Sequence, residues 1–200
     1  MRALFISLSL ILPLTACGDG DGTPRVRVAV EAAPAVTAPV ISEETITPLT
    51  EPAETKISDI RDILERNSLA RLVRLANAEE NFVSNFAGES HRVHWDLLRR
   101  TGFDPLMRLE ALLDGPYETR QVGDQVWYVW PDFAALEAED LLPEKLDFTD
   151  RARLRELVGE TGLARIRAGE SYPGIRTAIA EDGRWLYFVH ETAEETETSE

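Results

Sequence analysis

Residues 117–130 read YETRQVGDQVWYVW and have the pattern of a β-hairpin. Two runs rich in aromatic and β-branched residues flank Gly123-Asp124, a dipeptide that favours a tight turn. Residues 175–190 read IRTAIAEDGRWLYFVH and repeat the arrangement around Glu181-Asp182-Gly183. Both returning strands carry a tryptophan followed closely by a tyrosine. The sequence therefore predicts two β-hairpins that form an antiparallel sheet.

The residues before the first hairpin carry helical signals. Apolar residues over 57–64 and over 69–76 form two stripes that point in nearly opposite directions at 100° per residue, so one straight helix cannot bury both. We expect a break at Asn67-Ser68, with Ser68 as the N-cap of the second helix. A third helix is predicted over 90–100.

Two further helical regions complete the fold prediction. A fourth helix is expected over 104–113, with Asp104 as its N-cap and Pro105 in its first turn. Residues 148–169, between the hairpins, predict two helices separated at Gly159. N-terminal helices followed by two β-hairpins, with helices between the hairpins, predict an α+β domain with an antiparallel sheet.

Composition excludes several classes of function. The chain has 200 residues, with 36 Asp or Glu against 21 Lys or Arg and a net charge of −15. Nucleic-acid binding requires Lys and Arg to neutralise phosphates, so we expect no nucleic-acid partner. The single cysteine excludes an intramolecular disulfide and any metal site with several thiolates. We predict no metal and no cofactor.

The N-terminus has the pattern of an export signal. Residues 3–14 are almost entirely apolar but too few to span a bilayer, so they are typical of a signal peptide. Leu14-Thr15-Ala16-Cys17 follows directly and resembles the lipobox of bacterial lipoproteins. The resemblance covers only this export segment. It implies cleavage before Cys17, lipidation of the Cys17 thiol and an anchor in the cell envelope facing the periplasm. Gly18 rather than Asp after the cysteine implies the outer membrane.

The remaining chain divides by composition. After the signal peptide (1–16), residues 17–56 are rich in Pro, Thr, Ala, Val and Glu and lack aromatic residues, so we expect an extended tether that carries the lipidated cysteine. Residues 57–190 hold the predicted elements and form the globular domain. Residues 191–200 contain five glutamates and no basic residue, which is typical of a disordered acidic tail.

One polar cluster has the residue types of a catalytic or metal site. His91, His94 and Asp96, with Glu89 nearby, lie within one predicted helix and its N-terminal end. Two imidazoles and a carboxylate are used in both zinc and hydrolytic sites. The spacing differs from the zinc-protease pattern, and histidines in the first turn of a helix are more often surface polar residues.

Two other polar segments favour structural roles. Arg151, Arg153, Arg155, Arg165 and Arg167 are interleaved with acids, which is typical of a salt-bridged surface. Residues 171–174, Ser-Tyr-Pro-Gly, are typical of a turn.

The aromatic strands offer a candidate binding surface. Alternation places Tyr128 and Trp130 on one face of their strand and Trp127 on the other. We expect helices to cover one face of the sheet, with Trp127 in that core and with Tyr128 and Trp130 near the open side, available to a glycan or peptide. The alternative is that both faces are covered and all of these residues belong to the core.

These observations favour a lipid-anchored envelope protein whose small domain is a periplasmic binding or interaction module, with an envelope protein or glycan as partner. A long tether is useful to a domain that must reach something distant from its anchor. One alternative is an envelope hydrolase that uses His91 and His94 with a nearby carboxylate. Another is an inhibitor or immunity-type protein, which would fit the acidic composition.

Overall fold

The computed structural model describes residues 47–190, so Cys17, the signal peptide, most of the predicted tether and the 191–200 tail lie outside the described residues. The described part has the predicted α+β architecture. Its elements in chain order are α1 (Glu51–Glu65), α2 (Leu69–Ala78), α3 (His91–Arg100), α4 (Pro105–Leu113), β1 (Glu118–Val122), β2 (Gln125–Trp130), the 3-10 helix η1 (Asp132–Ala135), α5 (Phe148–Arg167), β3 (Arg176–Ala180) and β4 (Trp185–Val189).

Three of the predicted helix boundaries are confirmed by local backbone chemistry. Asn67, between α1 and α2, has a φ of 46°, a left-handed conformation that asparagine tolerates and that ends a helix. The Asp104 side chain accepts a hydrogen bond from the Leu106 amide at 3.0 Å and so caps α4. Gly159 has a φ of 65° and divides α5 into the two helical segments expected from the sequence.

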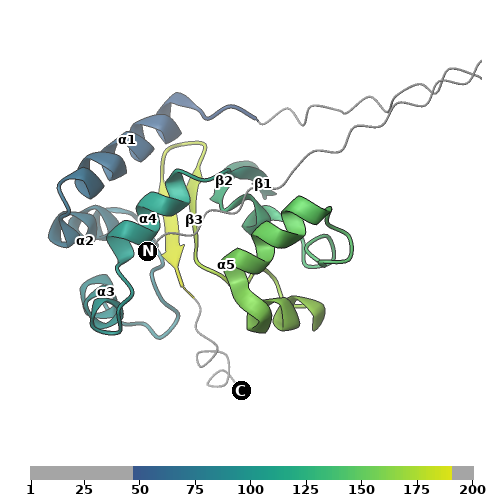
Figure 1. The fold of residues 1–200 in the computed structure, drawn as a ribbon. Helices are drawn as coiled ribbons and strands as arrows, with labels where there is room; N and C mark the ends of the chain where they lie inside the picture. The colour runs from purple at the N-terminus through teal and green to yellow at the C-terminus, as the bar shows by residue number, and fades with distance from the viewer. Residues whose placement is uncertain (1–46, 191–200) are drawn as a thin grey trace, which may run out of the picture. The chain divides into compact units, whose positions relative to one another are not determined.

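The four strands form one antiparallel sheet in the order β1-β2-β3-β4. The two hairpins therefore lie side by side, with β2 and β3 in the centre. Figure 1 shows α1, α2 and α3 on one side of the β3 and β4 ribbons and α5 on the other, while α4 overlaps the strands in this view and packs in the same apolar cluster as α1 to α3. Two separate apolar clusters correspond to this layering, one on each face of the sheet.

The larger cluster lies between the sheet and helices α1 to α4. Its strand residues are Tyr128, Trp130, Ile179, Trp185 and Phe188. Tyr128 and Trp130 are each only 2% exposed, so the expectation that they lie on an open face is wrong. The helices that precede the hairpins cover the Tyr128 face, because their four apolar stripes need a large surface on which to pack.

The second cluster covers the opposite face of the sheet. It joins Val129 and Ala178 of the sheet to buried residues of η1, the following loop and α5. Trp127 packs at the margin of this cluster and is only partly buried, so its assignment to the main helical core is also wrong. Of the two alternatives left open by the sequence, the structure supports coverage of both faces.

The N-terminal boundary of the domain lies earlier than predicted. Helix α1 begins at Glu51, not at Ile57, because Pro52 occupies its first turn, where the missing N–H is not needed. Residues before the helix are also fixed: the Tyr117 hydroxyl donates to the Thr47 carbonyl at 3.0 Å, and the Tyr128 hydroxyl donates to the Pro48 carbonyl at 3.1 Å. Residues 47–56 therefore belong to the folded domain.

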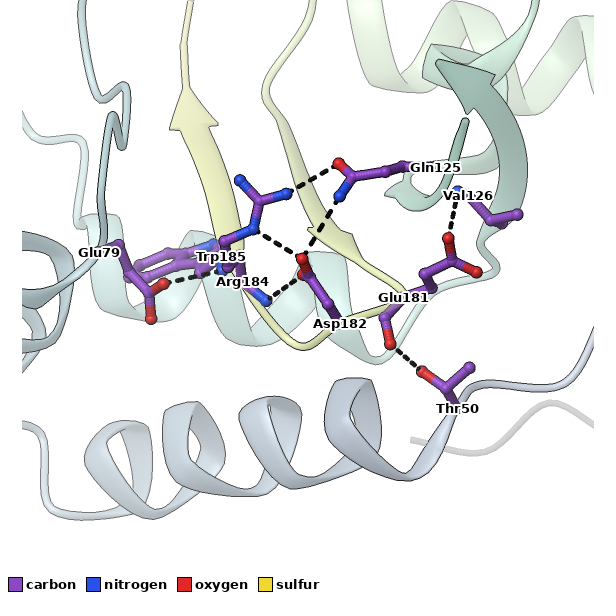
Figure 2. A network of polar contacts seen from close by, with 8 residues as sticks. All are labelled: Thr50, Glu79, Gln125, Val126, Glu181, Asp182, Arg184 and Trp185. Atoms are coloured by element: carbon purple, nitrogen blue, oxygen red, sulfur yellow. Dashed lines mark hydrogen bonds and ion pairs between the residues drawn. The ribbon is translucent and has the colours of Figure 1, made fainter. Parts of the chain in front are cut away.

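A polar network ties this N-terminal segment to the β3–β4 turn (Figure 2). The Thr50 hydroxyl donates to the Glu181 carbonyl at 2.6 Å, and the Glu181 carboxylate accepts from the Val126 amide at 3.2 Å. Glu79, at the end of α2, accepts from the Trp185 amide at 3.3 Å and also pairs with Lys56 of α1. The start of the domain is thus held against both hairpins.

The turn itself is braced by side chains. Asp182 accepts hydrogen bonds from the Arg184 amide at 3.1 Å and from its guanidinium Nε at 2.8 Å. Arg184 in turn donates to Gln125 at 2.8 Å, as Figure 2 shows. The hydrogen bonds among Asp182, Arg184 and Gln125 connect the turn to the first residue of β2 and hold the two hairpins in register.

Candidate functional site

A pocket of about 310 Å³ lies on the sheet face opposite α1 to α4. This volume is at the lower end of the range of about 300–1,000 Å³ that is typical of small-molecule sites. The lining residues come from all four strands, η1 and the loops before α3 and β3: Val83, Phe86, Arg120, Trp127, Ala134, Ser171, Tyr172, Arg176, Tyr187 and Val189. The pocket is therefore built from segments that are distant in sequence.

Sheet register brings two arginines to this pocket. Arg120 of β1 pairs directly with Trp127 of β2, so both side chains project from the same face. Arg176 of β3 pairs with Val189 of β4 and projects from that face as well. The two guanidinium groups thus reach one pocket from an edge strand and a central strand.

Both arginines are positioned by hydrogen bonds. Arg120 Nη2 donates to the exposed Glu137 carboxylate at 2.9 Å. Arg176 Nη1 donates to the backbone carbonyls of Tyr172 and Gly174, at 3.1 and 3.3 Å. An arginine has five N–H donors, so the one bond to Glu137 leaves Arg120 with donors that a ligand can use.

The aromatic walls add hydrogen-bonding groups to an apolar surface. The rings of Trp127 and Tyr187 meet edge to face with their centroids 6.4 Å apart. Burial raises the pKa of the Tyr187 phenol above its usual value, and the positive charges of Arg176 and Arg120 oppose this shift. The phenol therefore stays protonated at neutral pH and can donate a hydrogen bond.

Two buried donors beside the pocket have no acceptor among the described residues: the indole N–H of Trp127 and the hydroxyl of Tyr172. Burial raises the pKa of the Tyr172 phenol far above its usual range, so this hydroxyl is also protonated. A buried donor left unpaired costs about 1–3 kcal/mol. Both donor atoms are buried rather than exposed to the cavity, and His94 Nε2 in the core likewise has no hydrogen-bond partner among the described residues.

The electrostatic character of the pocket differs from that of the chain. The protein carries a net charge of −15, yet the lining residues that the structure describes include two arginines and no Asp or Glu, although Arg120 pairs with Glu137 beside the pocket. Arginine, indole and phenol groups on an otherwise apolar wall can bind an anionic group and hold an apolar body beside it. Among the described lining residues there is no histidine, aspartate or glutamate.

His91, His94 and Asp96, the polar cluster predicted from the sequence, each have a different partner in the structure. His91 Nδ1 lies 2.7 Å from the Ser84 hydroxyl, and Ser84 is only 1% exposed. His94 is 5% exposed, and its Nδ1 lies 4.0 Å from the Glu89 carboxylate. Asp96 pairs with Arg92 at 2.6 Å.

The surroundings of the histidines are those of a packed interior. The His91 ring lies edge to face with Phe82 at 5.1 Å between centroids and near Trp95 at 6.0 Å. Burial lowers the pKa of both His91 and His94. The two imidazoles are therefore neutral at pH 7; His94 is buried against the core at the start of α3, and His91 is partly exposed.

Acidification is expected to destabilise the domain through these two histidines. Because their pKa values are lowered on folding from the ordinary 6.5, the unfolded chain binds more protons below that pH, and stability rises with pH in this window. Denaturant unfolding across pH 5–7.5 should show a smaller decrease toward acid in a His91→Gln, His94→Gln double variant than in the wild type. An unchanged slope would show that neither histidine is shifted.

The other polar segments have the structural roles predicted for them, with one exception. Arg165 pairs with Glu170 and Arg167 with Glu144, as expected for a salt-bridged surface. Residues 171–174 do form an irregular segment before β3, but Ser171 and Tyr172 also line the pocket. The turn-like composition of residues 171–174 did not indicate that they would also line a pocket.

Sequence reasoning missed most of the pocket. Arg120 and Arg176 lie in strands of the two different hairpins, and only the pairing of β2 with β3 brings them to one face. A usable signal was present in the first hairpin: Arg120 is the cross-strand partner of Trp127, which places a charged and an aromatic residue on a face predicted to be core.

Among residues 47–190, no group of three or more His, Cys, Asp or Glu side chains is arranged to hold a metal ion. In the same part of the chain, no helix combines the length and apolarity needed to cross a membrane. Comparisons with protein-family models, with curated proteins and with solved structures gave no significant match to this chain.

Proposed function

We propose that this chain is a lipid-anchored envelope protein whose domain binds a small molecule in the pocket on the Trp127 face of the sheet. The anchor would be the lipidated Cys17 implied by the lipobox resemblance, and the protein would face the periplasm, at the outer membrane. Two or more acyl chains are sufficient to hold a protein stably on a bilayer. The folded domain would then act as a binding module at the end of its tether.

The observation that carries the binding proposal is the composition of the pocket wall. Arg120 and Arg176 from separate hairpins, together with four aromatic side chains, line one cavity of about 310 Å³. The rings supply apolar surface and the Arg120 guanidinium supplies hydrogen-bond donors on the same wall, which is the combination found in small-molecule sites.

Binding is favoured over the hydrolase alternative by the environment of the histidines. Ser84 and His94 are buried and Asp96 is engaged by Arg92. His91 is partly exposed, but its Nδ1 is hydrogen-bonded to the Ser84 hydroxyl, and no carboxylate among the described residues pairs with it as the orienting group of a general base. No contact in the described residues specifically favours the inhibitor or immunity-type alternative.

The binding proposal is tested by what the protein retains from its own environment. The purified full chain is incubated with the small-molecule fraction of a cell-envelope extract, recovered, denatured and analysed by mass spectrometry. We expect a compound bound at a fixed stoichiometry to the wild type. Ser171→Trp should abolish its retention, because Ser171 is exposed at the pocket and a tryptophan there fills the cavity with little cost to folding.

The matched control is Ser58→Trp, the same substitution at an exposed position of α1, on the other side of the sheet. This variant should retain the compound as the wild type does. Equal retention by wild type and Ser171→Trp, or no retained compound in any sample, would contradict a binding function of this pocket.

Anchoring is tested separately at Cys17. The Cys17→Ser variant removes the only thiol in the chain and should release the mature protein from membranes into a soluble form or leave it with its signal peptide. Fractionation of membranes followed by mass spectrometry of the N-terminus checks both results. An unmodified Cys17 in the native protein would show that the lipobox resemblance is misleading.

A further inference from the structure

We infer that residues 81–88, in the connector between α2 and α3, form a pH-sensitive strap. The strap lies on the edge of β4 and walls one side of the pocket while His91 and His94 are neutral, and it opens when they are protonated. The effect of this opening on a ligand rests on the proposed binding function, whereas the opening itself does not.

The strap is attached to the sheet through a single residue. Val83 pairs with Tyr187 in an isolated parallel bridge: its amide donates to the Leu186 carbonyl at 3.1 Å, and its carbonyl accepts from the Phe188 amide at 3.0 Å. Within residues 47–190, the strap makes no other backbone hydrogen bond to β4. An attachment of two hydrogen bonds can open locally while the sheet stays folded.

The strap is also part of the pocket wall. Val83 and Phe86 line the cavity, and Phe86 is 63% exposed. The two ends of the strap, Asn81 and Gly88, have left-handed φ values of 60° and 75°. A few loop residues of this kind can act as hinges. Movement of the segment between them would withdraw Val83 and Phe86 from the cavity, so opening of the strap removes one wall of the pocket.

A contact between Ser84 and His91 holds the strap against the start of α3. The Ser84 Oγ lies 2.7 Å from His91 Nδ1 and accepts from the Asn85 side-chain amide at 3.1 Å. Ser84 is 1% exposed, and its hydroxyl has no further hydrogen-bond partner among the described residues. Neutral His91 can accept the Ser84 proton, but a protonated imidazole carries N–H on both nitrogens and only donates. Protonation therefore leaves a buried hydroxyl without an acceptor, which is unfavourable.

His94 places a second charge in a buried position when it is protonated. It is 5% exposed, and its Nε2 has no hydrogen-bond partner among the described residues. The Glu89 carboxylate, 4.0 Å from Nδ1, favours the protonated form, but burial outweighs it and the pKa of His94 is lowered. Burial and the charge of His94 also lower the pKa of His91. Two protonated imidazoles therefore oppose the closed strap.

The other elements packed on the histidines supply no compensating charge. Phe82 of the strap lies edge to face with His91 at 5.1 Å between centroids, and it contacts Trp185 of β4 at 4.4 Å. The charged neighbours on α3, Arg92 and Asp96, pair with each other. Within the part of the chain that the structure describes, Glu89 is the only acid within 4.0 Å of either imidazole.

Hydrogen exchange of single amides in the full chain, followed by NMR at pH 7.5 and pH 5.5, tests the strap. The Val83 and Phe188 amides report on the bridge, and protection factors correct for the effect of pH on the intrinsic exchange rate. We expect both factors to fall at least about fivefold at pH 5.5, because the open strap binds protons that the closed strap does not. Their exchange should be nearly independent of low denaturant concentrations, as for a local opening, whereas amides between β2 and β3 should follow global unfolding.

Histidine variants assign the effect. In the His91→Gln, His94→Gln double variant, the protection factors of Val83 and Phe188 should differ less than twofold between the two pH values. The matched control is His190→Gln, the same change at the third histidine of the chain, which should keep the wild-type decrease. The comparison of the wild type at two pH values needs no variant, so it is decisive even if the double variant folds poorly.

Two results would overturn the inference. Protection factors of Val83 and Phe188 that are equal at both pH values would show that protonation does not open the strap. At pH 5.5, the same denaturant dependence for these amides as for those between β2 and β3 would show that the strap opens only with the whole domain. Neither measurement uses a ligand, so the strap and the binding function can fail independently.

Discussion

Trp130→Ala is expected to lower the free energy of unfolding by about 3–5 kcal/mol, the usual range for truncation of a buried tryptophan. Trp130 lies at the end of β2 in the core under α1 to α4, with its ring 5.1 Å from the Tyr117 ring between centroids. Trp127→Ala should cost only about 1–2 kcal/mol, because Trp127 is partly exposed at the pocket and loses less buried area.

Chemical denaturation of the two variants measures this difference, which is the reverse of the one expected from the sequence. The same samples separate stability from binding: Trp127→Ala should fold and lose the retained ligand. Equal destabilisation by both substitutions would indicate that Trp127 is as deeply buried as Trp130. Its side chain would then belong to the core and would not be available to a ligand in the pocket.

A chain that begins at Ile57 should be less stable by at least about 3 kcal/mol than one that begins at Thr47. The shorter chain loses the first turns of α1, including the fully buried Ala53, and the packing of Leu49 on the core. It also leaves the buried Tyr128 hydroxyl without its acceptor at Pro48, a cost of about 1–3 kcal/mol.

Thermal and denaturant unfolding of chains 47–190 and 57–190 test this boundary. The 47–190 chain should unfold in one cooperative transition without added metal or disulfide. Thr50→Val in the longer chain provides a milder variant, since it removes only the hydrogen bond to the Glu181 carbonyl. Equal stability of the two chains would place residues 47–56 in the tether, as the sequence alone suggested.

The fold was predictable because its elements carry strong local signals. The Asn67-Ser68 break, the Asp104 cap and the Gly159 interruption each follow from the chemistry of one or two residues, and the structure confirms all three. The start of α1 was not predictable in the same way, because a proline in the first turn of a helix and a proline in an extended tether have the same sequence pattern.

The candidate site depended on tertiary structure and was largely missed. Strand alternation correctly separated Trp127 from Tyr128 and Trp130, but it cannot say which face a helical layer will cover. That choice is made by the packing of α1 to α4, which bury the Tyr128 face. The position of Arg176 in the pocket needs the pairing of β2 with β3, a contact between residues about 50 positions apart.

The most direct test of a ligand pocket on this face is the ¹H–¹⁵N NMR signal of the Trp127 indole. The chain has four tryptophans, and Trp127→Phe assigns the signal that belongs to the pocket. When the small-molecule fraction of the envelope extract is added to the full chain, the Trp127 indole signal should shift because a ligand in the pocket changes the environment of the ring that lines it. The signals of the buried Trp95, Trp130 and Trp185 should stay in place. A Trp127 signal that does not move, whether or not the others do, would contradict the assignment of this pocket as the binding site.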